Sequence, residues 1–60
     1  MKLDDREKIL LDMADTRLAQ GLSFSRRAAL VATIRYVEHP NLRYALARAD
    51  AILHKMGGKK

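Results

Sequence analysis

The middle segment of the chain, residues 25–38, is apolar around almost its whole circumference. Its apolar positions are Ala28, Ala29, Leu30, Val31, Ala32, Ile34 and Val37. A helix with a single buried face carries a narrower stripe, so a segment of this kind needs cover on more than one side. We predict a helix over 25–38 that packs against its two neighbours and completes its cover with a second copy of the chain or a partner.

The preceding segment repeats its apolar residues with helical spacing, which predicts a helix over 4–20. Asp4 and Asp5 suit its N-cap and first turn, and Gly21 suits its C-terminal stop. The residues that share its main apolar face are Leu3, Leu10, Leu11, Ala14 and Leu18.

A second, smaller apolar spot lies on the other side of this helix, at Ile9 and Met13. Such a spot is either a peripheral packing contact or part of a partner surface. The sequence leaves both interpretations open.

The third segment has the most regular pattern and predicts a helix over 41–56, followed by a basic tail at 57–60. Pro40 disfavours helical geometry at His39, which ends the second helix, and is tolerated in the first turn of the third. The apolar positions of this helix are Leu42, Ala45, Leu46, Ala49, Ile52, Leu53 and Met56.

The linker at 21–25 is short, so the first two helices should be neighbours in space. Ser23 or Ser25 can cap the second helix. We expect Phe24 to fill the junction between the two helices.

The expected fold is a compact all-α domain of three helices that covers residues 1–60. A chain of this size buries only roughly 60 % of its unfolded surface, and it has no Cys and only two His to add disulfides or a metal. Oligomerisation is the remaining source of stability, and a closed bundle and a helix-swapped dimer are both compatible with the short joint before the third helix.

We expect homodimerisation through the middle helix, with Leu30, Ile34 and Val37 turned toward the other helices. The opposite arc of this helix carries alanines, which permit close contact with another helix. Its members are Ala28, Ala29, Ala32, Thr33 and Tyr36, with Arg35 at its edge. The predicted partner interface is Ala28, Ala29, Val31, Ala32 and Tyr36.

Charge supports a second hypothesis, because 12 basic residues outnumber 7 acidic ones and the excess lies after Leu22. Such an excess favours phosphate backbones or acidic protein surfaces. A nucleic-acid-binding function would use the polar face of the third helix and the start of the second, although the same face is equally well explained as a solvated one. The residues concerned are Arg26, Arg27, Arg43, Tyr44, Arg48 and Lys55.

Catalytic and metal-binding chemistry has little support in this sequence. His39 fits a cap or turn, and Asp50 with His54 fits a pair on a helix surface. Neither Ser23 nor Ser25 lies in a nucleophile elbow, and no glycine-rich phosphate loop is present. We therefore expect no enzyme activity, no cofactor, no metal and no small-molecule substrate.

Known DNA-binding motifs and membrane segments fit poorly. A helix-turn-helix centred on Gly21 would place Arg17 and Arg27 at packing positions, and no alternating strand precedes the first helix, as a ribbon-helix-helix needs. No apolar run is long enough to span a bilayer, and the charged N-terminus is unlike a signal peptide. We expect a complete, soluble, cytoplasmic protein: a self-associating protein-interaction or regulatory module or, alternatively, a DNA-binding regulator.

Overall fold

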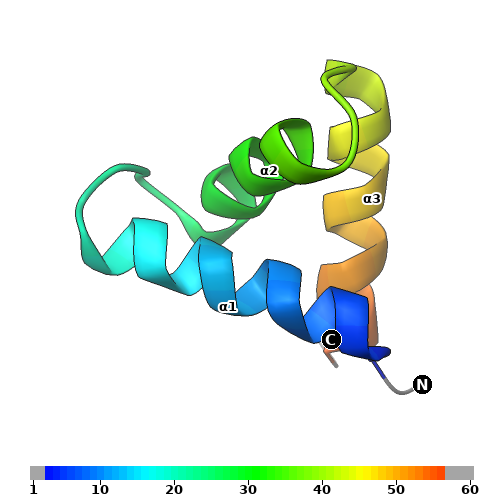
Figure 1. Ribbon diagram of the computed structural model, residues 1–60, viewed down its shortest axis with the longest axis horizontal. Coiled ribbons are helices and arrows are strands. Elements are labelled where there is room, and N and C mark those ends of the chain that lie inside the picture. Colours follow the sequence, from blue (N-terminus) through cyan, green and yellow to red (C-terminus); the bar gives the residue numbers. More distant parts are fainter. Residues whose placement is uncertain (1–2, 57–60) are drawn as a thin grey trace.

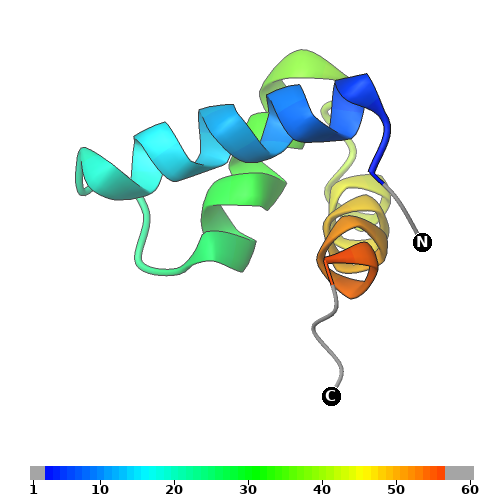
Figure 2. The same ribbon diagram turned by 90° about the horizontal axis from the view of Figure 1, so that it is seen from below.

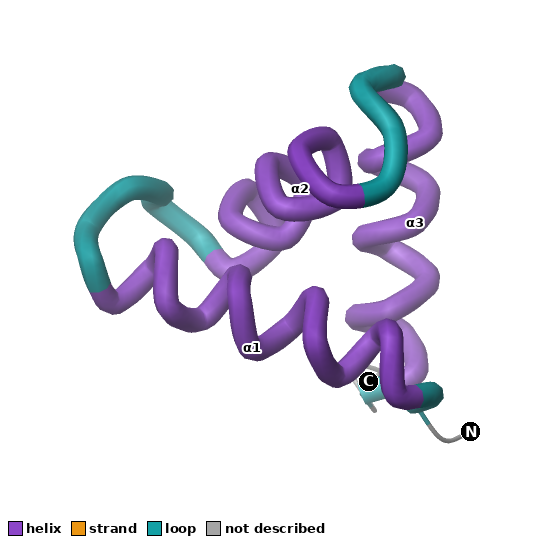
Figure 3. The backbone as a smooth tube through the Cα atoms, in the orientation of Figure 1, coloured by secondary structure: helices purple, strands orange, loops and turns teal. Residues whose placement is uncertain are grey.

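The computed structural model describes residues 3–56, which form three helices and contain no strand: α1 (Asp5–Ala19), α2 (Arg26–Val37) and α3 (Leu42–Lys55) (Figure 1, Figure 3). The prediction of an all-α three-helix domain is confirmed. Each predicted range exceeds the observed helix by one residue at either end, because it included the two capping residues. The expected basic tail at 57–60 lies outside the described residues.

Side chains and a glycine define the two ends of α1. The Asp4 carboxylate accepts a hydrogen bond of 2.7 Å from the Glu7 backbone N–H, and the Glu7 carboxylate accepts one of 3.0 Å from the Asp4 N–H. This reciprocal capping box satisfies two backbone donors at the N-terminus. At the other end Gly21 adopts φ of 75°, and the Gly21 and Leu22 N–H groups bond to carbonyls of the last turn, as in a Schellman motif.

Single polar side chains cap the other two helices. The Ser25 hydroxyl accepts a hydrogen bond of 3.1 Å from the Ala28 N–H, and the Asn41 side chain accepts one of 2.9 Å from the Tyr44 N–H. His39 lies in the loop between α2 and α3, and its Nδ1 accepts a bond of 3.0 Å from the Asn41 N–H. These local contacts set where each helix starts.

α2 packs against both α1 and α3 (Figure 1, Figure 2). The radius of gyration is 10.6 Å, close to the value of about 10.4 Å that a compact domain of this length should have. The three helices share one core, formed by Leu10, Leu11, Ala14, Ala29, Leu30, Val31, Ile34, Ala45, Ala49 and Ile52.

The expected outward arc of α2 is partly wrong. Ala29, Val31 and Thr33 are buried, and the Thr33 hydroxyl donates a bond of 2.8 Å to the Ala29 carbonyl. The reason is that α1 and α3 cover different sides of α2, so the chain itself supplies most of the cover that the apolar circumference requires. Val37, expected to face inward, is exposed at the end of the helix.

The expectation for Phe24 is also wrong. Its side chain is 93 % exposed, because the loop between α1 and α2 curves away from the helices (Figure 1). The helices of the described segment include none that has the length and apolar character to cross a bilayer.

Candidate protein-binding surface on α1 and α2

Exposed apolar side chains follow one stripe of α1. Ile9 is 59 % exposed, and Met13, one turn later, is also exposed. Arg17 follows after one further turn, since residues four apart lie on the same side of a helix. The smaller apolar spot predicted from the sequence is therefore present on the surface of the folded chain.

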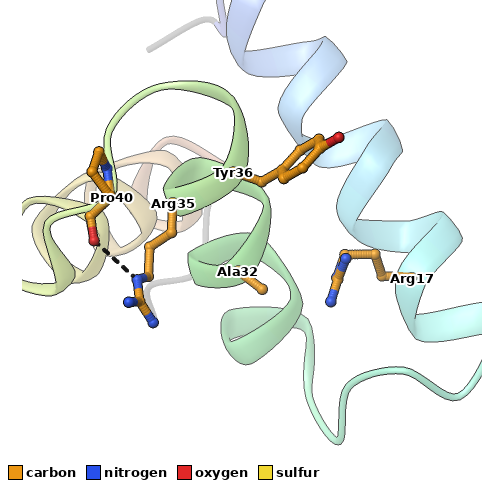
Figure 4. A pocket seen from close by; sticks show the side chains of 5 residues that line it. All are labelled: Arg17, Ala32, Arg35, Tyr36 and Pro40. Atoms are coloured by element: carbon orange, nitrogen blue, oxygen red, sulfur yellow. Dashed lines mark hydrogen bonds between the residues drawn. The ribbon is translucent and has the colours of Figure 1, made fainter.

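α2 adds two exposed side chains beside this stripe. Val37 lines a surface pocket of about 310 Å³ together with Arg6, Ile9 and Leu10. Tyr36 is 85 % exposed, and its ring points toward α1 (Figure 4). Ile9 and Val37 thus meet at one pocket between α1 and α2, and Tyr36 extends from α2 next to Val37 in the chain.

A second pocket, of about 320 Å³, crosses the outer side of α2 (Figure 4). Arg17 of α1 lies on one side of Ala32 and Arg35 of α2 lies on the other. Tyr36 and Pro40 complete the lining. We call the stripe and the two pockets together the α1–α2 surface, which consists of Arg6, Ile9, Met13, Arg17, Ala32, Arg35, Tyr36, Val37 and Pro40.

The five residues predicted as a partner interface separate into two groups. Ala32 and Tyr36 belong to the α1–α2 surface, and Ala28 is half-buried one turn before Ala32. Ala29 and Val31 belong to the core and offer no side chain to a partner. Sequence reasoning missed Arg17, although its spacing from Ile9 and Met13 was available as a signal.

The cations predicted to contact nucleic acid mostly bind carboxylates of the same chain. Arg26 Nε lies 3.1 Å from Asp15 Oδ1, and Arg27 Nε lies 2.7 Å from Asp50 Oδ1. The hydrogen bond from Arg27 lowers the pKa of Asp50. Asp50 therefore pairs with Arg27 of α2. The sequence had suggested a pair with His54 on the surface of α3 instead.

Two further cations of this set meet at Glu7, whose side chain is fully buried. Arg48 Nη1 and Lys55 Nζ each donate to Glu7 Oε2 at 3.0 Å. The pKa of Glu7 is lowered, first by the hydrogen bond from the Asp4 backbone N–H and then by that from Lys55, which together outweigh burial. The carboxylate thus joins the first turn of α1 to α3.

Glu38, the C-cap of α2, extends this network. Its carboxylate accepts hydrogen bonds of 3.3 Å from Arg48 Nε and from the Tyr44 hydroxyl, and it lies 3.5 Å from Arg6 Nη1. Of the six residues predicted to bind nucleic acid, Arg43 is the one without a carboxylate partner within residues 3–56. The capping-box spacing could have drawn attention to Glu7, but no sequence signal pairs it with Arg48.

Within residues 3–56 no three His, Asp or Glu side chains come together in a way that could hold a metal ion. The chemistry of the α1–α2 surface consists of apolar contact and hydrogen bonds from guanidinium groups. Comparison of the chain with protein-family models, with curated proteins and with solved structures finds no match, so no relative's role can be carried over to it.

Proposed function

We propose that this chain is a small, non-catalytic interaction module that binds the apolar face of a protein helix along the α1–α2 surface. The observation that carries the proposal is that exposed Ile9 of α1 and exposed Val37 of α2 line one pocket, with exposed Met13 one turn after Ile9 and exposed Tyr36 next to Val37 in the chain. Scattered single apolar residues are ordinary on a protein surface, whereas a contiguous group beside pockets is typical of interaction sites. An amphipathic helix placed in a groove is a recurrent way to cover such a group.

Nucleic-acid binding through α3 is the less favoured function. To contact phosphates, Arg48 and Lys55 would have to leave Glu7, whose carboxylate would then be buried without a cationic partner. Breaking a buried ion pair in this way costs roughly 3–5 kcal/mol. The exposed ion pairs of Arg26 with Asp15 and of Arg27 with Asp50 would cost less free energy to break, since an exposed pair contributes at most about 1 kcal/mol.

Symmetric pairing of two copies through α2 is also less favoured. A two-fold contact centred on Ala32 places the same patch of each copy face to face. Arg17 and Arg35 of both copies would then enter one interface, where like charges repel.

The proposal is tested by titrating a fluorescently labelled amphipathic helical peptide, with leucines on one face, against the protein. We expect saturable binding that Ile9→Glu weakens at least tenfold. Leu22→Glu is the matched control, because Leu22 is also 59 % exposed but lies in the loop before α2. Absence of binding to peptides of every flanking charge, with a monomer in sedimentation equilibrium, would refute the proposal.

The same sedimentation measurement tests self-association. A dimer that Tyr36→Ala dissociates would make a second copy the occupant of this surface. A monomer at all concentrations, together with peptide binding, would favour a different protein.

A further inference from the structure

The pocket around Ala32 differs from the rest of the α1–α2 surface because two arginines form its sides (Figure 4). From it we infer that the partner helix is acidic, and that the pocket between Arg17 and Arg35 receives its Asp or Glu side chains. This inference rests on the proposed function and specifies its ligand. It follows from the ion-pair and hydrogen-bond partners of the two guanidinium groups.

Five of the nine Lys and Arg side chains within residues 3–56 have a carboxylate partner, whereas Arg17 and Arg35, like Lys8 and Arg43, do not. Arg6, Arg26, Arg27, Arg48 and Lys55 each form an ion pair. The ion pairs within residues 3–56 include neither of the arginines beside the pocket. The pocket therefore has positive charge that no carboxylate of the described segment neutralises.

Arg17 also has an unsatisfied hydrogen-bond donor beside the pocket. Its Nε is buried and has no hydrogen-bond partner. Buried donors are rarely left unsatisfied, because the lost hydration is not replaced. Because Nε is covered by the chain itself, a carboxylate in the pocket would pair with the terminal nitrogens of this guanidinium and would reach Nε only after the side chain turns outward.

Arg35 is held in place by the chain itself. Its Nε donates a hydrogen bond of 3.1 Å to the Pro40 carbonyl (Figure 4). That bond uses the Nε and leaves the two terminal nitrogens for a ligand, in the fork geometry that suits a carboxylate. Holding the side chain beforehand reduces the entropy lost when the ligand binds.

The surroundings of the pocket favour an acidic helix over a phosphate backbone. Its floor is the Ala32 side chain, and its edge is the ring of Tyr36, next to exposed Val37. A helix with leucines on one face would cover the apolar lining of the pocket. Acidic residues beside those leucines would pair with the two arginines. A nucleic-acid backbone would leave the apolar part uncovered.

Two peptides separate this inference from the proposed function. They share the same leucine face, and one carries Glu at the flanking positions where the other carries Gln, a residue of similar shape and helix propensity. We expect the Glu peptide to bind the wild-type chain about tenfold more tightly at low salt, with a smaller difference at high salt. Arg17→Gln and Arg35→Gln should each reduce that preference, because each weakens binding of the Glu peptide more than binding of the Gln peptide.

Arg43→Gln is the matched control, since it removes one unpaired, exposed arginine from α3, and it should keep the preference intact. Equal affinity for both peptides would overturn the inference and leave the proposed function standing. Binding of neither peptide would overturn both. Displacement of the Glu peptide by duplex DNA, lost in Arg17→Gln, would also overturn the inference and make nucleic acid the occupant.

Discussion

Arg48 of α3 donates a hydrogen bond of 3.0 Å to Glu7 of α1, a residue 41 positions earlier in the chain. α1 and α3 each pack mainly on α2. The Glu7 carboxylate, which also binds Lys55, is therefore a principal direct link between the first helix and the last.

Replacement of this carboxylate should destabilise the fold. We expect Glu7→Gln to lower the free energy of unfolding by roughly 1.5–3 kcal/mol, because charge-assisted hydrogen bonds from Arg48 and Lys55 are weakened. Urea denaturation followed by circular dichroism measures the change. Asp5→Asn, which removes an exposed carboxylate from the same turn, is the control and should cost less than about 1 kcal/mol.

Stability should depend on pH through the same group. Glu7 has a lowered pKa in the folded chain, so the unfolded chain binds its proton at a higher pH, near the ordinary value of 4.5. The stabilisation is complete above that pH and is lost as the pH falls through the lower pKa of the folded state. Thermal unfolding between pH 7 and 2 should show this loss, and the Glu7→Gln profile should be flatter; parallel profiles would contradict the assignment.

Gly21 should be sensitive to substitution for a purely backbone reason. An added Cβ would meet no atom within 4 Å, but the residue has φ of 75°. Gly21→Ala should therefore cost about 1 kcal/mol or slightly more, measured as a lower urea midpoint. Gly21→Asn should cost less, since asparagine tolerates this conformation better; an equal loss for both would point to a cause other than φ.

The exposure of Phe24 can be checked against a true core position. Phe24→Ser should change the free energy of unfolding by no more than about 0.5 kcal/mol, because the ring contributes little buried area. Leu30→Ala, at a fully buried position, should cost roughly 2–5 kcal/mol or unfold the chain. A large loss in Phe24→Ser would show that the loop packs against the helices in solution.

The sequence by itself determined the three helices and their ends. Helical periodicity, the cap at Asp4 and the stop at Gly21 act between residues a few positions apart, whereas the choice of Ser25 over Ser23 and the cap at Asn41 came from the structure. Local interactions of this kind can be inferred without knowledge of the packing. The apolar spot at Ile9 and Met13 was visible for the same reason.

Tertiary structure alone decided which sides of α2 are covered and which charges are paired. Ala29 and Val31 looked like an outer strip, but α1 and α3 approach α2 from different directions and bury them. Arg48 and Lys55 looked like a free basic face until the fold brought them to Glu7. Helix crossing directions and contacts between distant positions depend on how three amphipathic surfaces fit together, which no local pattern encodes.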